Sequence, residues 1–402
     1  MAVENMKKFE EMMEPFKMAG DLIIAKAAGD SAKMYNRLCE ARKILMGPLE
    51  TGIAMTPYDV EYEEDRVKLK HYRPMVETCY RFPLLVIYAQ VNRETMLDLQ
   101  PGKSVVETLL KAGIDVYMID WGYPTRKDRY LTLGDHINGY IDNIVDHILE
   151  KHSLPQLHLM GICMGGTFCV IYTALHAAKV KNLITTVTPT NFDTKDGLLN
   201  VWAAAINPET MVEAYGNIPG DVMNIAFLLL NPARLMIDKY VGFLENIDNK
   251  EFVENFIRME KWIFDSPDLP GETFREFFNI TYRDNLLIQN KLKIDGKPVD
   301  LKKIVVPVLN IYAKYDHLVP PSACELLTKN IGSADTEDLC LDTGHIGIYV
   351  SSKTQKEFAP KIIGWLAERD QPAPGSKKPK AATGKAIKKK AEKKAPPNER
   401  IK

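Results

Sequence analysis

The sequence predicts an α/β fold, in which a mostly parallel sheet has helices on both faces and an inserted helical lid. Two observations support this class. From residue 83 onward, short apolar runs of β type alternate with helical stretches, and the alternation is interrupted once, between residues 191 and 301. The hydrophobic fraction of 46% and the charged fraction of 26% are ordinary for a globular protein, which excludes a collagen-like, coiled-coil or wholly disordered chain.

Six apolar runs are expected to form the main strands. They are continuous rather than alternating, as is typical of strands buried on both faces. Helices fit between them at 133–151 and 166–178, a last helix is expected at 355–369, and short strands are expected at 58–72. The six expected strands are 83–91, 115–121, 157–162, 183–188, 306–312 and 336–341.

The pattern divides the chain into an N-terminal region, a core, a lid and a tail. The core is expected at 77–190 and 302–369, and the aromatic-rich, helical segment 191–301 between its halves is expected to be the lid. The N-terminal region, 1–76, begins with a helical stretch at 3–48 that has one apolar face. This face either packs on the body of the protein or docks a partner.

Residues 370–402 form a low-complexity tail rich in Lys, Ala and Pro. From Gln371 onward it holds ten Lys and one Arg against two Glu, a charge of +9, so the net charge of −1 leaves −10 on the body. The tail lacks the apolar residues that would offset the entropy of ordering, and it is expected to be disordered. Two interpretations stay open: a solvated extension, or a polybasic segment that binds nucleic acid or an acidic partner.

The sequence also disfavours membrane-spanning helices, a signal peptide, a metal site and a disulfide framework. No apolar run approaches the roughly 18–20 residues of a membrane helix, and the start of the chain lacks the apolar segment of a signal peptide. The cysteines include no CxxC pair, so neither a metal site nor a disulfide framework is expected. Free thiols without an export signal predict a cytoplasmic protein. The cysteines are at positions 39, 79, 163, 169, 324 and 340.

The most specific local motif is Gly161-Ile162-Cys163-Met164-Gly165, which follows an expected strand and precedes an expected helix. It matches the nucleophile elbow G-x-S-x-G of the α/β-hydrolase fold, with Cys in place of Ser. The glycines are needed because the nucleophile lies on a strained turn whose neighbours have no room for side chains. The turn also places the thiol at a helix N-terminus, which favours the thiolate. We therefore expect an α/β-hydrolase fold with Cys163 as the nucleophile.

A thiol nucleophile needs a base, and the base needs a group that orients it. In this fold the acid and then the histidine follow the nucleophile along the chain. Asp316 follows the expected strand 306–312, and His345 follows the strand 336–341. Because catalytic groups gather at the carboxyl ends of parallel strands, Cys163, Asp316 and His345 are expected to converge. His317, the neighbour of the acid, is the weaker candidate base.

The oxyanion hole is expected to use two backbone N–H groups. One belongs to Met164, which follows the nucleophile, and the other is assigned to Val91 in the loop after the first long strand. Asp120 and Trp121 end another strand, and we interpret them as a turn-fixing acid and a packing indole.

A cysteine nucleophile suggests the chemistry of the donor. A thiolate exchanges with a thioester at little thermodynamic cost, so Cys163 is suited to accept an acyl group from an acyl-thiol carrier. The acyl-enzyme is then attacked by water in a hydrolase, or by a substrate hydroxyl in an acyltransferase. The triad alone does not distinguish these outcomes.

Longer segments of the sequence favour an acyltransferase over a hydrolase. In these segments the sequence resembles the polyhydroxyalkanoate synthases, and most closely their class III enzymes. The resemblance extends over about residues 55–369, and the total length fits the short class III and IV catalytic subunits. The matching segments are LLVIYAQVNR (84–93), DVYMIDWGYP (115–124), INGYID (137–142), GICMGGTF (161–168), KVKNLITTVTPTNF (179–192), GNIPG (216–220), MEKWIFDSPDLPGETFREF (259–277), LNIYAKYDHLVPP (309–321) and TGHIGIYV (343–350).

The resemblance implies a role for each residue of the triad. Cys163 would be acylated by an (R)-3-hydroxyacyl-CoA, His345 would remove the thiol proton, and Asp316 would help to activate the 3-hydroxyl that attacks next. CoA would be a product, with no cofactor and no metal. The resemblance also implies a mobile lid, a location on cytoplasmic polyester granules, and a homo- or hetero-oligomer with a second subunit of the PhaE type rather than the PhaR type.

Two other functions are compatible with parts of this pattern. A Cys-type α/β-hydrolase, such as a thioesterase or a dienelactone hydrolase-like enzyme, would use the same triad and release free acid. A catalytically silent granule scaffold is disfavoured because all three triad positions are filled.

Overall fold

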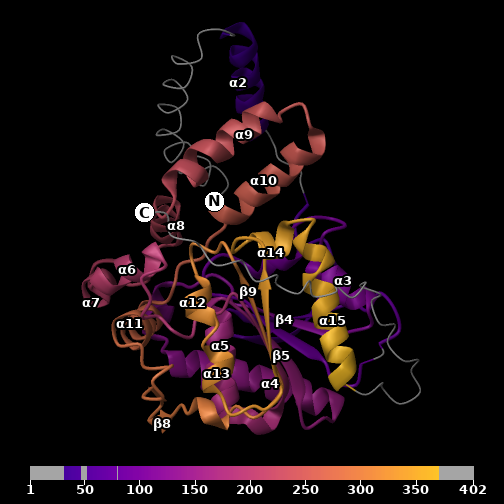
Figure 1. Cartoon of the computed structure of the whole chain (residues 1–402), viewed down its shortest axis with the longest axis vertical. Coiled ribbons are helices and arrows are strands. Elements are labelled where there is room, and N and C mark those ends of the chain that lie inside the picture. Colours follow the sequence, from indigo (N-terminus) through magenta and orange to yellow (C-terminus); the bar gives the residue numbers. More distant parts are fainter. Residues whose placement is uncertain (1–30, 47–51, 79, 371–402) are drawn as a thin grey trace, which may run out of the picture.

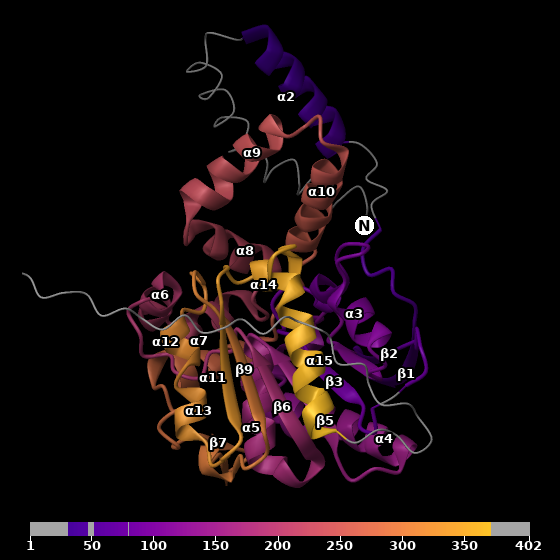
Figure 2. The ribbon, with the colours of Figure 1, turned by 45° about the vertical axis from the view of Figure 1, so that its right-hand side comes forward.

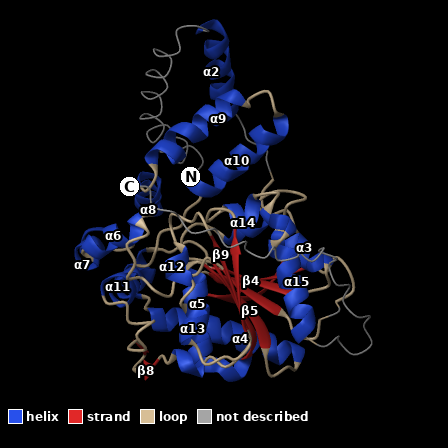
Figure 3. Ribbon diagram, in the orientation of Figure 1, coloured by secondary structure: helices blue, strands red, loops and turns tan. Residues whose placement is uncertain are grey.

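The computed structural model describes residues 31–46, 52–78 and 80–370, and these contain one large sheet of eight strands (Figures 1 and 3). The strand order is β1-β2-β4-β3-β5-β6-β9-β10. The strands are β1 (Tyr58–Glu64), β2 (Val67–Tyr72), β3 (Leu84–Ile87), β4 (Val116–Asp120), β5 (Leu157–Ile162), β6 (Val180–Thr186), β9 (Val308–Ala313) and β10 (Thr336–Leu341).

The sheet is mostly parallel, as predicted. Strands β3, β4, β5, β6, β9 and β10 pair in parallel, whereas the hairpin β1–β2 joins the β4 edge in an antiparallel manner. Strands β3, β4 and β5 are buried at every position, which explains their continuous apolar sequences. The hairpin, although it comes from the N-terminal region, therefore extends the sheet of the core.

Helices cover both faces of the sheet (Figure 2). Helix α3 begins after Ser104, whose hydroxyl accepts a hydrogen bond from the backbone N–H of Glu107, a normal N-terminal cap. Helix α5 is apolar on nearly every side and almost wholly buried: it packs on β5 and β6, and Phe168 contacts Phe277 of the inserted segment. The principal core helices are α3 (Val105–Lys111), α4 (Asp142–His152), α5 (Met164–His176) and α15 (Phe358–Arg369).

Between β6 and β9 the chain forms a series of helices and one small hairpin. Helices α8, α9 and α10 extend beyond the carboxyl end of the sheet, with α2 at their far end (Figures 1 and 2). The elements are α6 (Leu198–Ala205), α7 (Pro208–Tyr215), α8 (Gly220–Leu229), η5 (Ala233–Asp238), α9 (Lys239–Glu245), α10 (Lys250–Phe264), α11 (Gly271–Phe278), η6 (Asn279–Arg283), β7 (Lys293–Ile294) and β8 (Lys297–Pro298).

The described part of the N-terminal helix, α2 (Ser31–Met46), packs on the inserted segment. Ala41 is buried with Phe243 and Phe256 in a small second core, and Arg37 pairs with Asp248. This contact supports packing on the protein itself for the described part of the helix. The rest of the stretch 3–48, and the tail 371–402, lie outside the described residues.

None of the described helices could by itself span a membrane. Helix α8 and the segment Ala233–Glu245 reach the necessary length only together, across a bend of 107°.

The fold is completed by eight shorter elements: α12 (Pro321–Cys324), α13 (Leu327–Asn330), α14 (Gly347–Val350), η1 (Glu94–Asp98), η2 (Arg126–Tyr130), η4 (Ala177–Lys179), η7 (Leu301–Lys303) and η8 (Thr354–Lys356).

Most elements differ from the sequence prediction by no more than about three residues at an end, and two differ more substantially. Strand β3 ends at Ile87 rather than at Val91, and just beyond it the carbonyl of Tyr88 accepts a hydrogen bond from the indole of Trp121 at 2.9 Å. The helix expected at 133–151 starts at Leu133 as predicted but contains a π-helical stretch, η3 (Asp135–Ile141), before α4 begins at Asp142.

Candidate active site

Cys163 lies on the sharp turn between β5 and α5, as predicted for a nucleophile elbow. Its backbone has φ 53° and ψ −123°, a conformation that a non-glycine residue adopts only under constraint. The constraint comes from both sides of the turn, since the N–H of Cys163 bonds the carbonyl of Thr186 at 3.0 Å and its own carbonyl accepts from Thr167. The turn leaves the thiol partly exposed at the start of α5.

The glycines of the motif are required by close contacts. A Cβ on Gly161 would lie 2.7 Å from the Sγ of Cys169, and one on Gly165 would lie 2.6 Å from the carbonyl carbon of Tyr88. Gly165 therefore lets the elbow lie directly against the chain that leaves β3. This packing therefore requires glycine at positions 161 and 165, two residues before and two residues after Cys163.

Substitution of Gly165 by alanine is expected to destabilise the protein by about 1–3 kcal/mol, because the new methyl group overlaps backbone that cannot rotate away. Urea unfolding would measure the change. Gly364→Ala is the matched control, since an added Cβ there meets nothing within 4 Å and alanine favours its helix, α15. Equal unfolding midpoints for the Gly165 variant and the wild type would contradict the steric explanation.

The structure brings Asp316 and His345 together at the carboxyl ends of β9 and β10. The Nδ1 of His345 lies 2.6 Å from Oδ2 of Asp316, and both residues are buried. The other carboxylate oxygen, Oδ1, accepts hydrogen bonds from the backbone N–H groups of Leu318 and Val319, each at 2.9 Å. Both oxygens of Asp316 are thus occupied, and the carboxylate is held in one orientation.

Cys163 is close enough to His345 to be among the causes that raise the pKa of the imidazole, so the three predicted residues lie together. Burial alone would lower the pKa of His345, but the charge and hydrogen bond of Asp316 and the interaction with Cys163 outweigh burial and raise it to about 10. The raised pKa makes the imidazole of His345 a stronger base toward the thiol of Cys163. This arrangement suits a thiolate–imidazolium pair.

His317 is oriented differently from its neighbour Asp316. Burial lowers the pKa of His317, the positive groups His345 and Arg234 lower it further, and Asp316 opposes them only in part. Among the described hydrogen bonds, none links His317 to Cys163. The geometry thus favours His345 as the base.

Three tyrosines, two of them buried and one half-buried, lie near the thiol, and the sequence motifs do not reveal them. Burial raises the pKa of each phenol, and Cys163 is near enough to add to the effect for all three. The hydroxyl of Tyr349 is 2.9 Å from Oγ1 of Thr186 at the end of β6. The tyrosines are Tyr88, Tyr282 and Tyr349.

The two residues expected to form the oxyanion hole lie on different segments of the chain. Met164 is the first residue of α5, directly after the thiol. Val91 is half-buried in the loop between β3 and η1 and packs against the core. The chain just before Val91, at Tyr88, is the part that contacts the elbow through Gly165. The role of both N–H groups stays a prediction.

A buried cluster of four charged residues lies beneath the loop that holds Val91. The Nζ of Lys70 is 2.5 Å from Oε1 of Glu94 and 2.8 Å from Oδ2 of Asp120, and Arg93 pairs with both carboxylates. The carbonyl of Arg93 also accepts a hydrogen bond from the indole of Trp262 in the inserted segment. Asp120 therefore does more than fix a turn, because it helps to anchor the loop after β3.

Replacement of Lys70 by methionine is expected to destabilise the protein by about 3–5 kcal/mol, because two buried carboxylates would be left with one cation. Lys68→Met is the matched control on the same strand; its partner Glu63 is exposed, so the loss should be about 0–1 kcal/mol. Thermal or urea unfolding of both variants would measure the difference. Equal losses of stability in the two variants would contradict the role of Lys70 in neutralising two buried carboxylates.

Comparisons with known proteins agree with this architecture. The model of the alpha/beta hydrolase fold matches residues 94–351, and the model of the poly-beta-hydroxybutyrate polymerase (PhaC) N-terminus matches residues 27–109.

Three curated relatives share the name poly(3-hydroxyalkanoate) polymerase subunit PhaC. The relative from Thiocystis violacea is 47% identical over 80% of this chain and 90% of its own length. The relative from Allochromatium vinosum is 48% identical over the same shares. The relative from Haloferax mediterranei is 43% identical over 85% of this chain and 70% of its own length. By this identity and coverage, the chain belongs to the PhaC family of poly(3-hydroxyalkanoate) polymerase subunits, acyltransferases of the α/β-hydrolase fold.

Proposed function

We propose that the protein transfers (R)-3-hydroxyacyl groups, with 3-hydroxybutyryl as the expected unit, from CoA thioesters to the hydroxyl end of a growing polyester. The acyl group would pass through a covalent thioester on Cys163. The proposal rests on the side chains of Cys163, His345 and Asp316, which lie together at the carboxyl end of the sheet. It also rests on relatives that are named polymerase subunits.

In the first half-reaction, the Cys163 thiolate would attack the thioester carbonyl. A new carbon–sulfur bond forms to Sγ, the bond to the sulfur of CoA breaks, and the CoA thiolate takes the proton from His345. The N–H groups of Met164 and Val91 would stabilise the negative oxygen that forms during this step. This half-reaction leaves His345 neutral and able to act as a base.

In the second half-reaction, a hydroxyl would attack the acyl-Cys163 thioester. Neutral His345 would accept the hydroxyl proton as the new ester bond forms and the thiolate of Cys163 leaves. Asp316 would assist through His345 rather than by touching the hydroxyl, because both its oxygens are already bonded.

The inserted segment 191–301 would act as a lid that keeps water from the acyl-enzyme. Two features support this role. Trp262 ties the segment to the loop after β3, and Tyr282 from the same segment lies near Cys163. Exclusion of water would favour polymer growth over hydrolysis of the same intermediate.

The segment's exposed apolar side chains fit contact with a polyester granule or with a PhaE-type second subunit, in a cytoplasmic homo- or hetero-oligomer. We propose both contacts, the PhaR-type subunit being the less favoured partner. The tail, which lies outside the described residues, keeps its two predicted interpretations. The exposed side chains include Leu198, Val201, Trp202, Ile225, Leu229 and Ile237.

A CoA-release assay with 3-hydroxybutyryl-CoA tests the proposed function. The purified chain, with and without a PhaE-type subunit, should release CoA and yield insoluble polyester. Release of CoA with an equal amount of free 3-hydroxybutyrate would instead identify a Cys-type α/β-hydrolase. No release under either condition would contradict both activities.

A further inference from the structure

The loop after β3 lies between the nucleophile elbow and the inserted segment. At its start, the backbone of Tyr88 packs on the elbow so closely that a Cβ on Gly165 would lie 2.6 Å from the carbonyl carbon of Tyr88. At its other end, the carbonyl of Arg93 accepts a hydrogen bond from the indole of Trp262 at 2.8 Å. Val91 lies between these two contacts, so the direction of its N–H depends on both.

Asn92, the next residue, makes a further contact with the inserted segment. Its Nδ2 donates a hydrogen bond to Oγ of Ser266 and lies 3.4 Å from the carbonyl oxygen of Ile263. The buried side chain of Asn224 braces the same two groups, because its own Nδ2 donates to the carbonyl of Ile263 at 2.7 Å and to Oγ of Ser266 at 3.0 Å. The segment therefore presents a fixed set of acceptors to Asn92.

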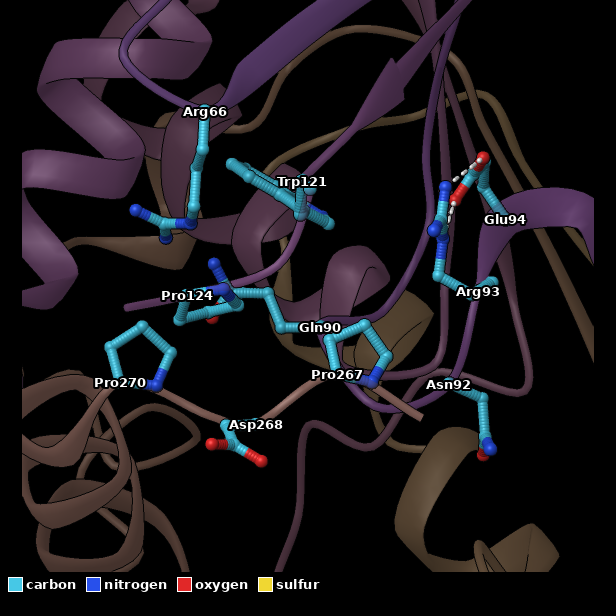
Figure 4. A pocket seen from close by; sticks show the side chains of 11 residues that line it. Arg66, Gln90, Asn92, Arg93, Glu94, Trp121, Pro124, Pro267, Asp268 and Pro270 are labelled. Atoms are coloured by element: carbon cyan, nitrogen blue, oxygen red, sulfur yellow. Dashed lines mark hydrogen bonds and ion pairs between the residues drawn. The ribbon is translucent and has the colours of Figure 1, made fainter. Parts of the chain in front are cut away.

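The backbone at Asn92 explains how the loop reaches the core and the segment together. Its φ is 58°, in the left-handed region that asparagine adopts more readily than most residues. Figure 4 shows the side chains of Asn92 and Arg93 extending to opposite sides of the loop, with Arg93 directed toward Glu94. Arg93 thus fixes the loop to the buried charges of the core, and Asn92 fixes it to the inserted segment.

The contacts on the segment gather at the end of α10. Trp262 and Ile263 belong to its last turn, and Ser266 follows it directly. Tyr123, in the loop after β4, adds a contact there, since its hydroxyl donates to Asp265. Because these contacts lie within five residues, a displacement of the end of α10 would break them together.

We propose that Asn92 is a positioning residue, which holds the N–H of Val91 in its productive direction only while the end of α10 is docked on the loop after β3. Docking of the inserted segment would then complete the oxyanion hole in the same movement that excludes water. This role rests on the proposed function, since it presumes that the N–H of Val91 stabilises the oxyanion.

Asn92→Gly tests the role kinetically, because glycine keeps the left-handed backbone and removes the amide. The kcat for CoA release from 3-hydroxybutyryl-CoA should fall about 10–100-fold with little change in KM, since an oxyanion contact acts in the transition state. Alkylation of Cys163 by iodoacetamide should keep the wild-type rate, because the sulfur displaces iodide from a saturated carbon and no oxyanion forms. An unchanged kcat, or an equal loss in both reactions, would overturn the role.

The matched control is Asn290→Gly. Asn290 also has a left-handed backbone, with φ 55°, and its side chain accepts a hydrogen bond from the N–H of Leu301 at 2.8 Å. Its described hydrogen bonds do not involve the loop after β3, so its substitution should leave kcat unchanged. A loss of kcat as large as that of Asn92→Gly would contradict a specific role for Asn92.

Ser266→Ala removes the other end of the same hydrogen bond. This variant should also lower kcat, and the double variant Asn92→Gly/Ser266→Ala should lose no more than Asn92→Gly alone, because both changes break one interaction. Losses that multiply in the double variant would show that the two residues act independently, and would overturn the coupling.

Hydrogen exchange separates this coupling from the proposed function, because it needs no substrate. In the full-length chain, Ser266→Ala should speed exchange in peptides that cover residues 91–93, although the substitution lies in the inserted segment, and Asn290→Gly should not. Faster exchange there supports the coupling even if the wild type releases no CoA, in which case only the proposed function fails. Unchanged exchange at residues 91–93 in Ser266→Ala would overturn the coupling.

Discussion

Replacement of Cys163 by alanine is expected to abolish CoA release from 3-hydroxybutyryl-CoA, with a loss of about 10⁴-fold or more. The reason is that no other described thiol lies on a strained turn close to a histidine. Cys169 and Cys324 are fully buried, and burial raises the pKa of both thiols well above the ordinary value, so neither can supply the thiolate. CoA release followed with a thiol reagent would measure the loss.

Cys340→Ala is the matched control for this experiment. Cys340 is the exposed thiol on β10, away from the elbow, and its removal should leave turnover unchanged. Turnover of the Cys163→Ala variant at the wild-type rate would refute covalent catalysis by this residue.

Substitution of Asp316 by asparagine is expected to lower kcat by roughly 10⁴-fold, as when the orienting acid of a similar triad is lost. The amide has no charge to stabilise the imidazolium of His345, and it can present an N–H where Oδ2 accepted a hydrogen bond. Since the charge and hydrogen bond of Asp316 are the largest causes that raise the pKa of His345, that pKa should fall well below about 10 in the variant. NMR titration of the imidazole would follow the change.

The same variant changes how stability depends on pH. The raised pKa of His345 contributes stability that is fully present below pH 6.5 and is lost as pH rises toward about 10. Asp316→Asn should remove this contribution, whereas Asp342→Asn, which alters an exposed carboxylate on the same side of β10, should keep it. Parallel curves of stability against pH for the wild type and Asp316→Asn would contradict a stabilising interaction between Asp316 and protonated His345.

The positions of the three candidate catalytic residues were predictable because their sequence signals are local. The glycines around Cys163 mark the turn, and Asp316 and His345 each follow a continuous apolar run that ends at the same edge of a parallel sheet. Their spatial convergence then follows from sheet topology. The segments that resemble polyhydroxyalkanoate synthases added the substrate class, which the triad does not specify.

The surroundings of the triad were less predictable because they depend on long-range pairing. Lys70 meets Asp120 only because β2 runs antiparallel to β4, and nothing near residue 70 indicates that partner. Asn92 directly follows an apolar run that was expected to be strand throughout, so its bonds to the inserted segment could be recognised only in the structure. Tyr282 is far from Cys163 in sequence and approaches it through the inserted segment.

The most direct test of the central claim is to trap the acyl-enzyme. The full-length chain would be mixed with 3-hydroxybutyryl-CoA, quenched in acid and digested, and the peptides analysed by mass spectrometry. We predict 3-hydroxybutyryl groups, singly or as short oligomers, on the peptide that contains Cys163, and no such adduct in the Cys163→Ala variant. Full CoA release with an unmodified Cys163 peptide, or with the acyl group on another residue, would contradict the mechanism.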